Sequence, residues 1–112
     1  MRSWPFEPEV REIVALLARG AYDAIERRSA GIRLSAAELE EAVARYGRRL
    51  TVPPADAEPP LDVVPHDDGG GWSVDVPLWT VEEGRSDLTL QLTVRRGEKG
   101  DHRIEIDDLH VL

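Results

Sequence analysis

The sequence contains no cysteine, and this absence excludes several kinds of chemistry at once. A chain without cysteine forms no disulfide bond, has no thiolate nucleophile and binds no sulfur-ligated zinc. Asparagine is also missing, and Lys99 is the one lysine among 14 basic residues, the others being arginine. We attribute this skew to a GC-rich genome rather than to chemistry that requires arginine.

Long apolar segments are missing as well. The longest apolar run covers residues 13–18, whereas a membrane-spanning helix needs about 20 apolar residues. The first nine residues include Glu7 and Glu9 and lack the apolar core of a signal peptide. We therefore expect a cytoplasmic protein.

Positive charge is scarce, because 22 acidic residues oppose 14 basic ones and the net charge is −8. Proteins that bind nucleic acid or anionic membranes need a basic surface, so we expect neither partner. The chain has 112 residues, of which 41% are hydrophobic and 32% charged. These values are typical of one globular domain, which we place at residues 1–112.

The first half of the chain, about residues 8–47, has the apolar spacing of amphipathic helices. A first helix is predicted up to Gly20, a second over residues 22–28 with Gly31 ending it, and a third up to Gly47. The third helix should begin at a capping box, in which Ser35 and Glu38 exchange hydrogen bonds with each other's backbone N–H groups.

The second half, about residues 61–112, alternates apolar and polar residues as strands do. Strands are predicted at residues 61–65, 72–78, 88–94 and 104–111, with a further short edge strand possible at 48–52. The connecting loops are short, so the strands should form an antiparallel meander. The alternation changes phase between Ile106 and Leu109, which predicts a β-bulge at Asp107-Asp108.

These elements predict an α+β fold. Three N-terminal helices should pack their apolar faces on one side of a curved antiparallel sheet of about four strands. Such an arrangement buries both sets of apolar residues in a single core.

The helices before a curved meander, with the motif Gly-Ala-Tyr-Asp-Ala-Ile at residues 20–25, resemble the NTF2-like (cystatin-like) superfamily. The resemblance implies a sheet wrapped around the helices, often with a pocket. That superfamily includes enzymes, immunity proteins and modules that only dimerise, so the likeness implies a shape and not a reaction.

Three segments, residues 76–80, 84–90 and 106–112, resemble a bacterial family of small proteins of unknown function. The likeness spans most of residues 10–112. It implies a shared fold, and that family supplies no activity, cofactor or catalytic residue to transfer.

Asp108 and His110 are the first candidate site residues. Two residues apart on a strand, they should lie on the same face, where an oxygen and an imidazole can bind a metal, with Asp75 as a third ligand. The structural alternative is that Asp107 and Asp108 cap the backbone of the bulge. No strong metal-ligand spacing is present, so we predict no metal site.

Asp75 and Trp79 are the other candidates. Asp75 either lies in solvent on the polar face of the sheet or lines a cavity, where burial would make it a general base. Trp79 should lie on the same polar face and serve as an anchor for a partner. Its structural alternative is packing under the loop at residues 82–86.

The glycine-rich segment at residues 66–71 is read as a hairpin turn, because it lacks the spacing of a calcium loop and the lysine of a phosphate loop. No nucleophile elbow, serine–histidine–aspartate pattern or dinucleotide fingerprint is present. We therefore predict no catalytic residue and no cofactor.

The sequence favours a non-enzymatic binding or interaction module that forms a homodimer through its sheet. An acidic domain of this size can also neutralise a basic partner, as immunity proteins do. The alternative is a small-molecule binding protein or enzyme with a polar site between helices and sheet, built from Asp75 or from Asp108 and His110.

Overall fold

The computed structural model describes residues 4–29, 31–32, 34–54 and 61–111. Three helices confirm the predicted N-terminal half: α1 (Glu7–Ala18), α2 (Tyr22–Arg28) and α3 (Ala36–Tyr46). None of these described helices has the length and apolarity that crossing a membrane requires.

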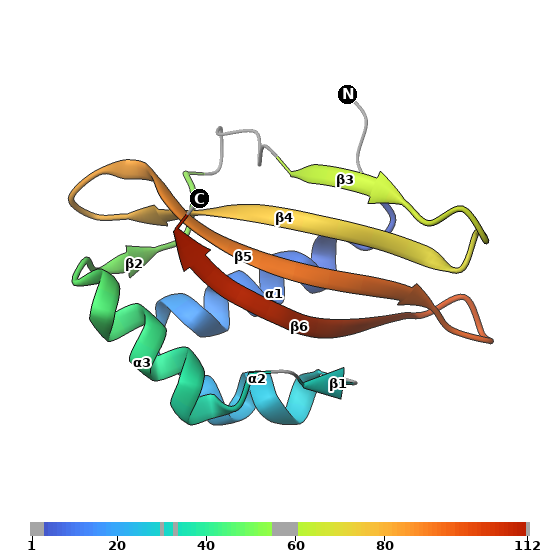
Figure 1. The fold of residues 1–112 in the computed structure, drawn as a ribbon, viewed down its shortest axis with the longest axis horizontal. Helices are drawn as coiled ribbons and strands as arrows, with labels where there is room; N and C mark the ends of the chain where they lie inside the picture. The colour runs from blue at the N-terminus through green and yellow to red at the C-terminus, as the bar shows by residue number, and fades with distance from the viewer. Residues whose placement is uncertain (1–3, 30, 33, 55–60, 112) are drawn as a thin grey trace.

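The strands form one open, mostly antiparallel sheet, so the fold is α+β as predicted (Figure 1). The described strands are β1 (Gly31–Ile32), β2 (Leu50–Thr51), β3 (Asp62–Pro65), β4 (Gly71–Thr80), β5 (Gly84–Arg96) and β6 (His102–Val111). Their order is β1-β6-β5-β4-β2, and β3 also pairs with β4. The run from β3 to β6 is the predicted meander.

The sheet has more strands than the four expected. The short edge strand predicted near residue 50 is present as β2, whereas β1 was not predicted. Gly31, expected to end α2, instead lies in β1 and pairs in parallel with Glu105 of β6. Helix α2 ends at Arg28 because Ser29 already has extended backbone angles.

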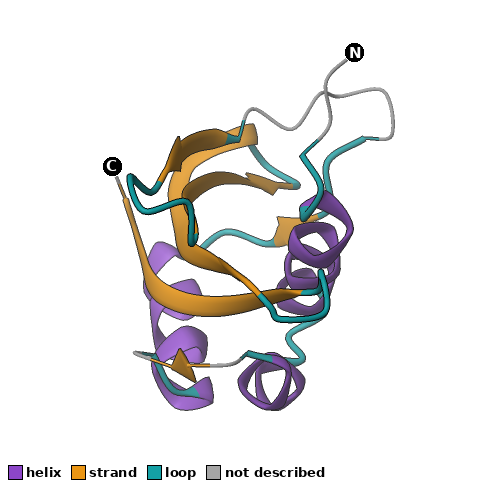
Figure 2. Cartoon of the chain, turned by 90° about the vertical axis from the view of Figure 1, so that its right-hand side faces the viewer, coloured by secondary structure: helices purple, strands orange, loops and turns teal. Residues whose placement is uncertain are grey.

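One hydrophobic core joins the helices to the sheet. Figure 2 shows the strands curving around α1. Buried apolar residues come from one stripe of each helix and from alternate positions of β4, β5 and β6, among them Ile13, Leu17, Ile25, Leu39, Val74, Leu90, Leu92, Val94 and Ile106. The predicted burial of the β5 leucines against the helices is confirmed.

The start of α1 is attached to the hairpin between β5 and β6. The ring of Phe6, fully buried, lies 4.9 Å from that of Trp72 and 6.2 Å from that of His102. His102 Nδ1 is also 2.9 Å from Glu9 Oε2. These contacts connect residues near the beginning of the chain to its last hairpin.

The predicted capping box and C-cap of α3 are both present. Ser35 Oγ accepts a hydrogen bond from the Glu38 N–H at 3.2 Å, and Glu38 Oε1 accepts one from the Ser35 N–H at 3.1 Å. Gly47 has a φ of 76°, a left-handed conformation that favours glycine at the end of a helix.

The bulge in β6 is confirmed at the predicted place. Asp108 pairs with Gln91 and Ile106 pairs with Leu92, so Asp107 is the additional residue. This extra residue keeps both Ile106 and Leu109 on the buried face. Asp108 Oδ1 accepts a hydrogen bond from the Leu109 N–H at 2.9 Å, as the structural alternative expected of this residue. Asp107, which was expected to cap the backbone as well, instead accepts a hydrogen bond from the Thr93 hydroxyl at 2.6 Å.

A second irregularity lies between β4 and β5 and was not predicted. Pro77 pairs with Thr89 and Trp79 with Arg85, so residues 86–88 lie opposite Leu78. The hydroxyl of buried Ser86 donates to the Leu78 carbonyl at 2.8 Å and accepts from the Leu88 N–H at 3.2 Å. Ser86 thus satisfies backbone groups that the irregular pairing leaves open.

Replacing Ser86 by alanine should therefore destabilise the protein. We expect Ser86→Ala to lower the free energy of unfolding by about 1–3 kcal/mol, because buried backbone groups lose their partner. Ser73→Ala is the matched control, since Ser73 is exposed, and it should cost less than about 0.5 kcal/mol. Urea unfolding of both variants measures the difference, and equal losses would contradict this role of Ser86.

Candidate functional site

All four candidate residues lie on the side of the sheet that faces away from the core, which we call the outer face. Asp75, Trp79, Asp108 and His110 alternate with buried neighbours on their strands. In Figure 1, α1 lies behind the strands, and no described helix covers the outer face. The expectation that Asp75 and Trp79 share the polar face is met.

Asp108 and His110 form a close pair on β6. His110 Nδ1 lies 2.9 Å from Asp108 Oδ2, and both side chains are partly exposed. The other Asp108 oxygen is engaged by the Leu109 N–H in the bulge. The pair therefore has a structural role in the bulge and an accessible imidazole beside a carboxylate.

Asp75 does not join that pair. It lies opposite Gln91 of β5, which in turn lies opposite Asp108. Two strand spacings, about 10 Å, thus separate the backbones at Asp75 and Asp108, and the side chain of Gln91 lies between them. Among the described residues, no group of three potential ligands could hold a metal ion.

The structure places these residues away from the space between helices and sheet. Asp75 is flanked by Val74 and Val76, which point into the core and are buried. Asp75 itself is partly exposed on the opposite face, so it cannot line a cavity beneath the helices. Asp108 and His110 share its side of the sheet.

Trp79 is half-buried near one end of the outer face. A methyl group added at Gly84 would lie 3.7 Å from its Cζ3 atom, so the ring packs beside the first residue of β5, which belongs to the segment 82–86 named by the structural alternative. Its Nε1 atom is buried and has no hydrogen-bond partner among the described residues. The ring retains a partly exposed surface despite this packing.

Charged side chains on the outer face lie in two rows across the strands. An acidic row consists of Asp62, Asp75 and Asp108, with Gln91 between the last two. An arginine row consists of Arg95 and Arg103, which are direct cross-strand partners. Like charges placed directly opposite one another destabilise a sheet, so both rows are costly in an isolated chain.

Among the described residues, few charges compensate these rows. Arg95 Nε donates to Glu105 Oε2 at 2.7 Å, and this hydrogen bond, followed by the nearby negative charge, raises the pKa of Arg95. Asp62, Asp75 and Arg103 form no hydrogen bond or ion pair through their side chains with other described residues. The pattern was missed in the sequence because it depends on the register of three strand pairs.

Comparison with known proteins identifies the family. The model of a domain of unknown function (DUF7668) matches residues 14–112. The chain belongs to this family. That assignment confirms the expected likeness to an uncharacterised family, while no curated protein and no solved structure matches the chain. The NTF2-like resemblance is therefore not confirmed.

Because the indole N–H of Trp79 has no partner among the described residues, we expect two substitutions of this residue to differ in stability. Trp79→Phe keeps a ring on Gly84 and removes the unsatisfied donor, so it should change the free energy of unfolding by less than about 0.5 kcal/mol or stabilise the protein. Trp79→Ala loses the packing and should cost about 1–3 kcal/mol. Denaturant unfolding of dilute protein distinguishes the two, and equal costs would show that the N–H has an acceptor.

Proposed function

We propose that this domain is a non-enzymatic interaction module that pairs with a second copy of itself through the outer face. The observation that carries the proposal is the arrangement of charge in an acidic row and an arginine row on an uncovered sheet. Each row is unfavourable alone, and each is the electrostatic complement of the other. A second copy supplies both complements at once.

The spacing of the rows fits a two-fold axis. Thr93 lies midway between Gln91 in the acidic row and Arg95 in the arginine row, which are about 13 Å apart along β5. An axis lying in the interface and running across the strands over Thr93 reverses the strand direction. It therefore brings the arginine row of each copy to the level of the acidic row of the other, as an isologous contact requires. Because each strand then faces the same strand of the other copy, Arg103 lies over Asp108 and Arg95 lies over Gln91.

The shape of the sheet limits the strength of this contact. Because the sheet curves around α1 (Figure 2), its outer face is convex. Two convex faces meet along a central band, which here contains the charged rows, while Trp79 lies toward the rim. We expect a reversible dimer that depends on ionic contacts and weakens as salt screens them.

The NTF2-like architecture also remains a proposal. Support comes from three helices that precede a strongly curved meander and from the single core between them. Self-association through the sheet is consistent with that architecture. The expected cytoplasmic location likewise remains a prediction from the sequence.

Charge reversal in the arginine row tests the dimer. Sedimentation of the wild type at low salt should show dimers at concentrations of about tens of micromolar. Arg103→Glu should weaken the dimer by about tenfold or more, because it places negative charge over the acidic row. Arg27→Glu, an equal charge change on an exposed residue of α2, is the matched control and should have no effect.

A mixing experiment makes the test specific. Asp108→Arg alone should also weaken self-association, because Asp108 and Arg103 of the other copy face each other across the axis. Mixed with Arg103→Glu, it should form a heterodimer in which both of these cross-copy pairs are of opposite charge again. A strictly monomeric wild type under these conditions would overturn the proposal. So would equal effects of Arg103→Glu and Arg27→Glu.

A further inference from the structure

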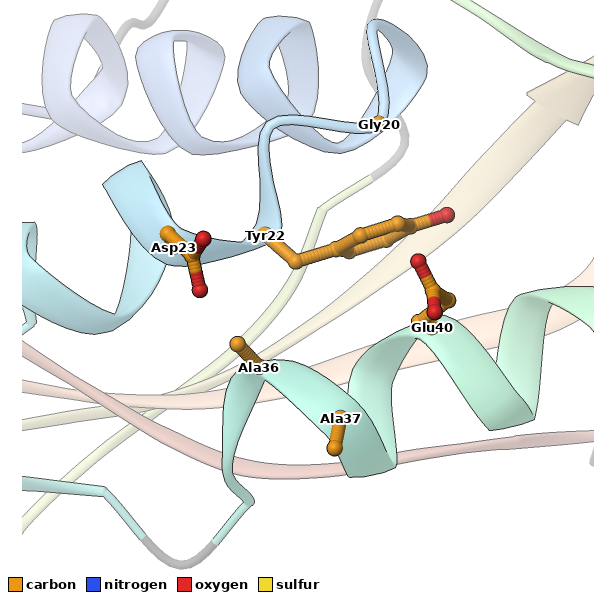
Figure 3. Close-up of a pocket in the computed structure, with 6 residues that line it drawn as sticks. All are labelled: Gly20, Tyr22, Asp23, Ala36, Ala37 and Glu40. Carbon is orange, nitrogen blue, oxygen red and sulfur yellow. The ribbon is translucent and has the colours of Figure 1, made fainter.

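A pocket of about 330 Å³ lies on the helical side of the molecule, between α2 and α3 (Figure 3). Its two charged lining residues, Asp23 and Glu40, are both exposed. The described lining residues do not select one class of ligand. A more specific arrangement lies on the outer face, where one carboxylate has two different cationic groups within reach in the proposed dimer.

That carboxylate belongs to Asp108, which has a single oxygen left for a further partner. Its Oδ1 atom accepts a hydrogen bond from the Leu109 N–H at 2.9 Å, inside the bulge of β6. Its Oδ2 atom lies 2.9 Å from Nδ1 of His110. In the proposed dimer, Arg103 of the other copy also lies over Asp108. His110 and that arginine therefore compete for the same oxygen.

The charge of His110 decides this competition. Its Nδ1 atom is shielded from water and has no aligned hydrogen-bond partner among the described residues. Histidine side chains change their charge between about pH 5 and 8. A neutral imidazole leaves the negative charge of Asp108 available to the arginine of the other copy. A protonated imidazole pairs with Oδ2 and adds a positive charge that repels the incoming guanidinium.

Within its own chain, His110 faces carboxylates rather than cations. No described helix covers this face of the sheet (Figure 1). On β5 its direct partner is the uncharged Thr89, and Asp87 lies two residues before that threonine. On β4 the residue at this level is Pro77. Asp108 on β6 is the remaining charged neighbour, so the chain itself supplies no positive charge at this place among the described residues.

Across the proposed interface, His110 meets charges of both signs at different distances from the axis. Arg103 of the other copy lies over Asp108, about 7 Å along the strand from the axis. Asp101 of the other copy lies at the level of His110, about 13 Å from the axis. Because both faces are convex (Figure 2), they separate with distance from the axis, and the arginine is the closer of the two. Protonation of His110 therefore opposes the dimer.

We propose that His110 is a pH switch for the dimer, and that its protonation releases the second copy. This inference rests on the proposed function, because it concerns the same face of the sheet. At pH 8 the neutral imidazole permits the contact between Asp108 and Arg103. At pH 6 the imidazolium replaces that contact within its own chain, and the monomer is favoured.

Sedimentation at low salt, at pH 8 and at pH 6, tests the switch. The dissociation constant of the wild-type dimer should rise by about fivefold at pH 6, as expected when two exposed ion pairs per dimer are weakened. His110→Gln should have about the same dissociation constant at both pH values. Exposed carboxylates remain ionised throughout this range, so they do not produce the difference.

A second histidine supplies the matched control. His66 Nε2 lies 3.1 Å from the Ser73 hydroxyl, away from Asp108, so His66→Gln should retain the pH dependence of the wild type. A wild-type dimer with equal dissociation constants at pH 6 and pH 8 would overturn the switch and leave the dimer standing. Equal loss of the pH dependence in His66→Gln and His110→Gln would do the same. A wild type that is monomeric at both pH values would instead overturn the proposed function, and the switch with it.

Discussion

Exclusion of water from one face of β4, β5 and β6 is the constraint on which the rest of this structure depends. Leu90, Leu92 and Val94 are at most 1% exposed, and the helices supply the cover. Because side chains alternate along a strand, this burial determines which residues face outward. The charged rows, Trp79 and the Asp108–His110 pair lie on the outer face for that reason alone.

The same constraint explains the bulge in β6, whereas a polar side chain supports the second irregularity of the sheet. In β6, an additional residue at Asp107 lets Ile106 and Leu109 point to the same side. In β5, residues 86–88 span the place of a single residue of β4, and the Ser86 hydroxyl bonds the backbone there. The sheet thus tolerates disrupted backbone pairing more readily than exposure of its apolar residues.

Local patterns in the sequence predicted the elements well, because their signals lie within a few residues. The capping box at Ser35, the glycine at position 47 and the phase change before Leu109 all have local physical causes. The parallel pairing of Gly31 with Glu105 has no such signal. The charged rows escaped prediction for a related reason, since each residue appears ordinary until the cross-strand register is known.

The attachment of the first helix to the last hairpin has a consequence for how this chain acquires its structure. His102 and Glu9 are 93 positions apart in sequence, and β1 likewise pairs with the distant strand β6. Contacts this distant close slowly, because a long loop must lose its freedom before they form. During synthesis on a ribosome, the apolar face of α1 therefore stays incompletely buried until β6 has emerged.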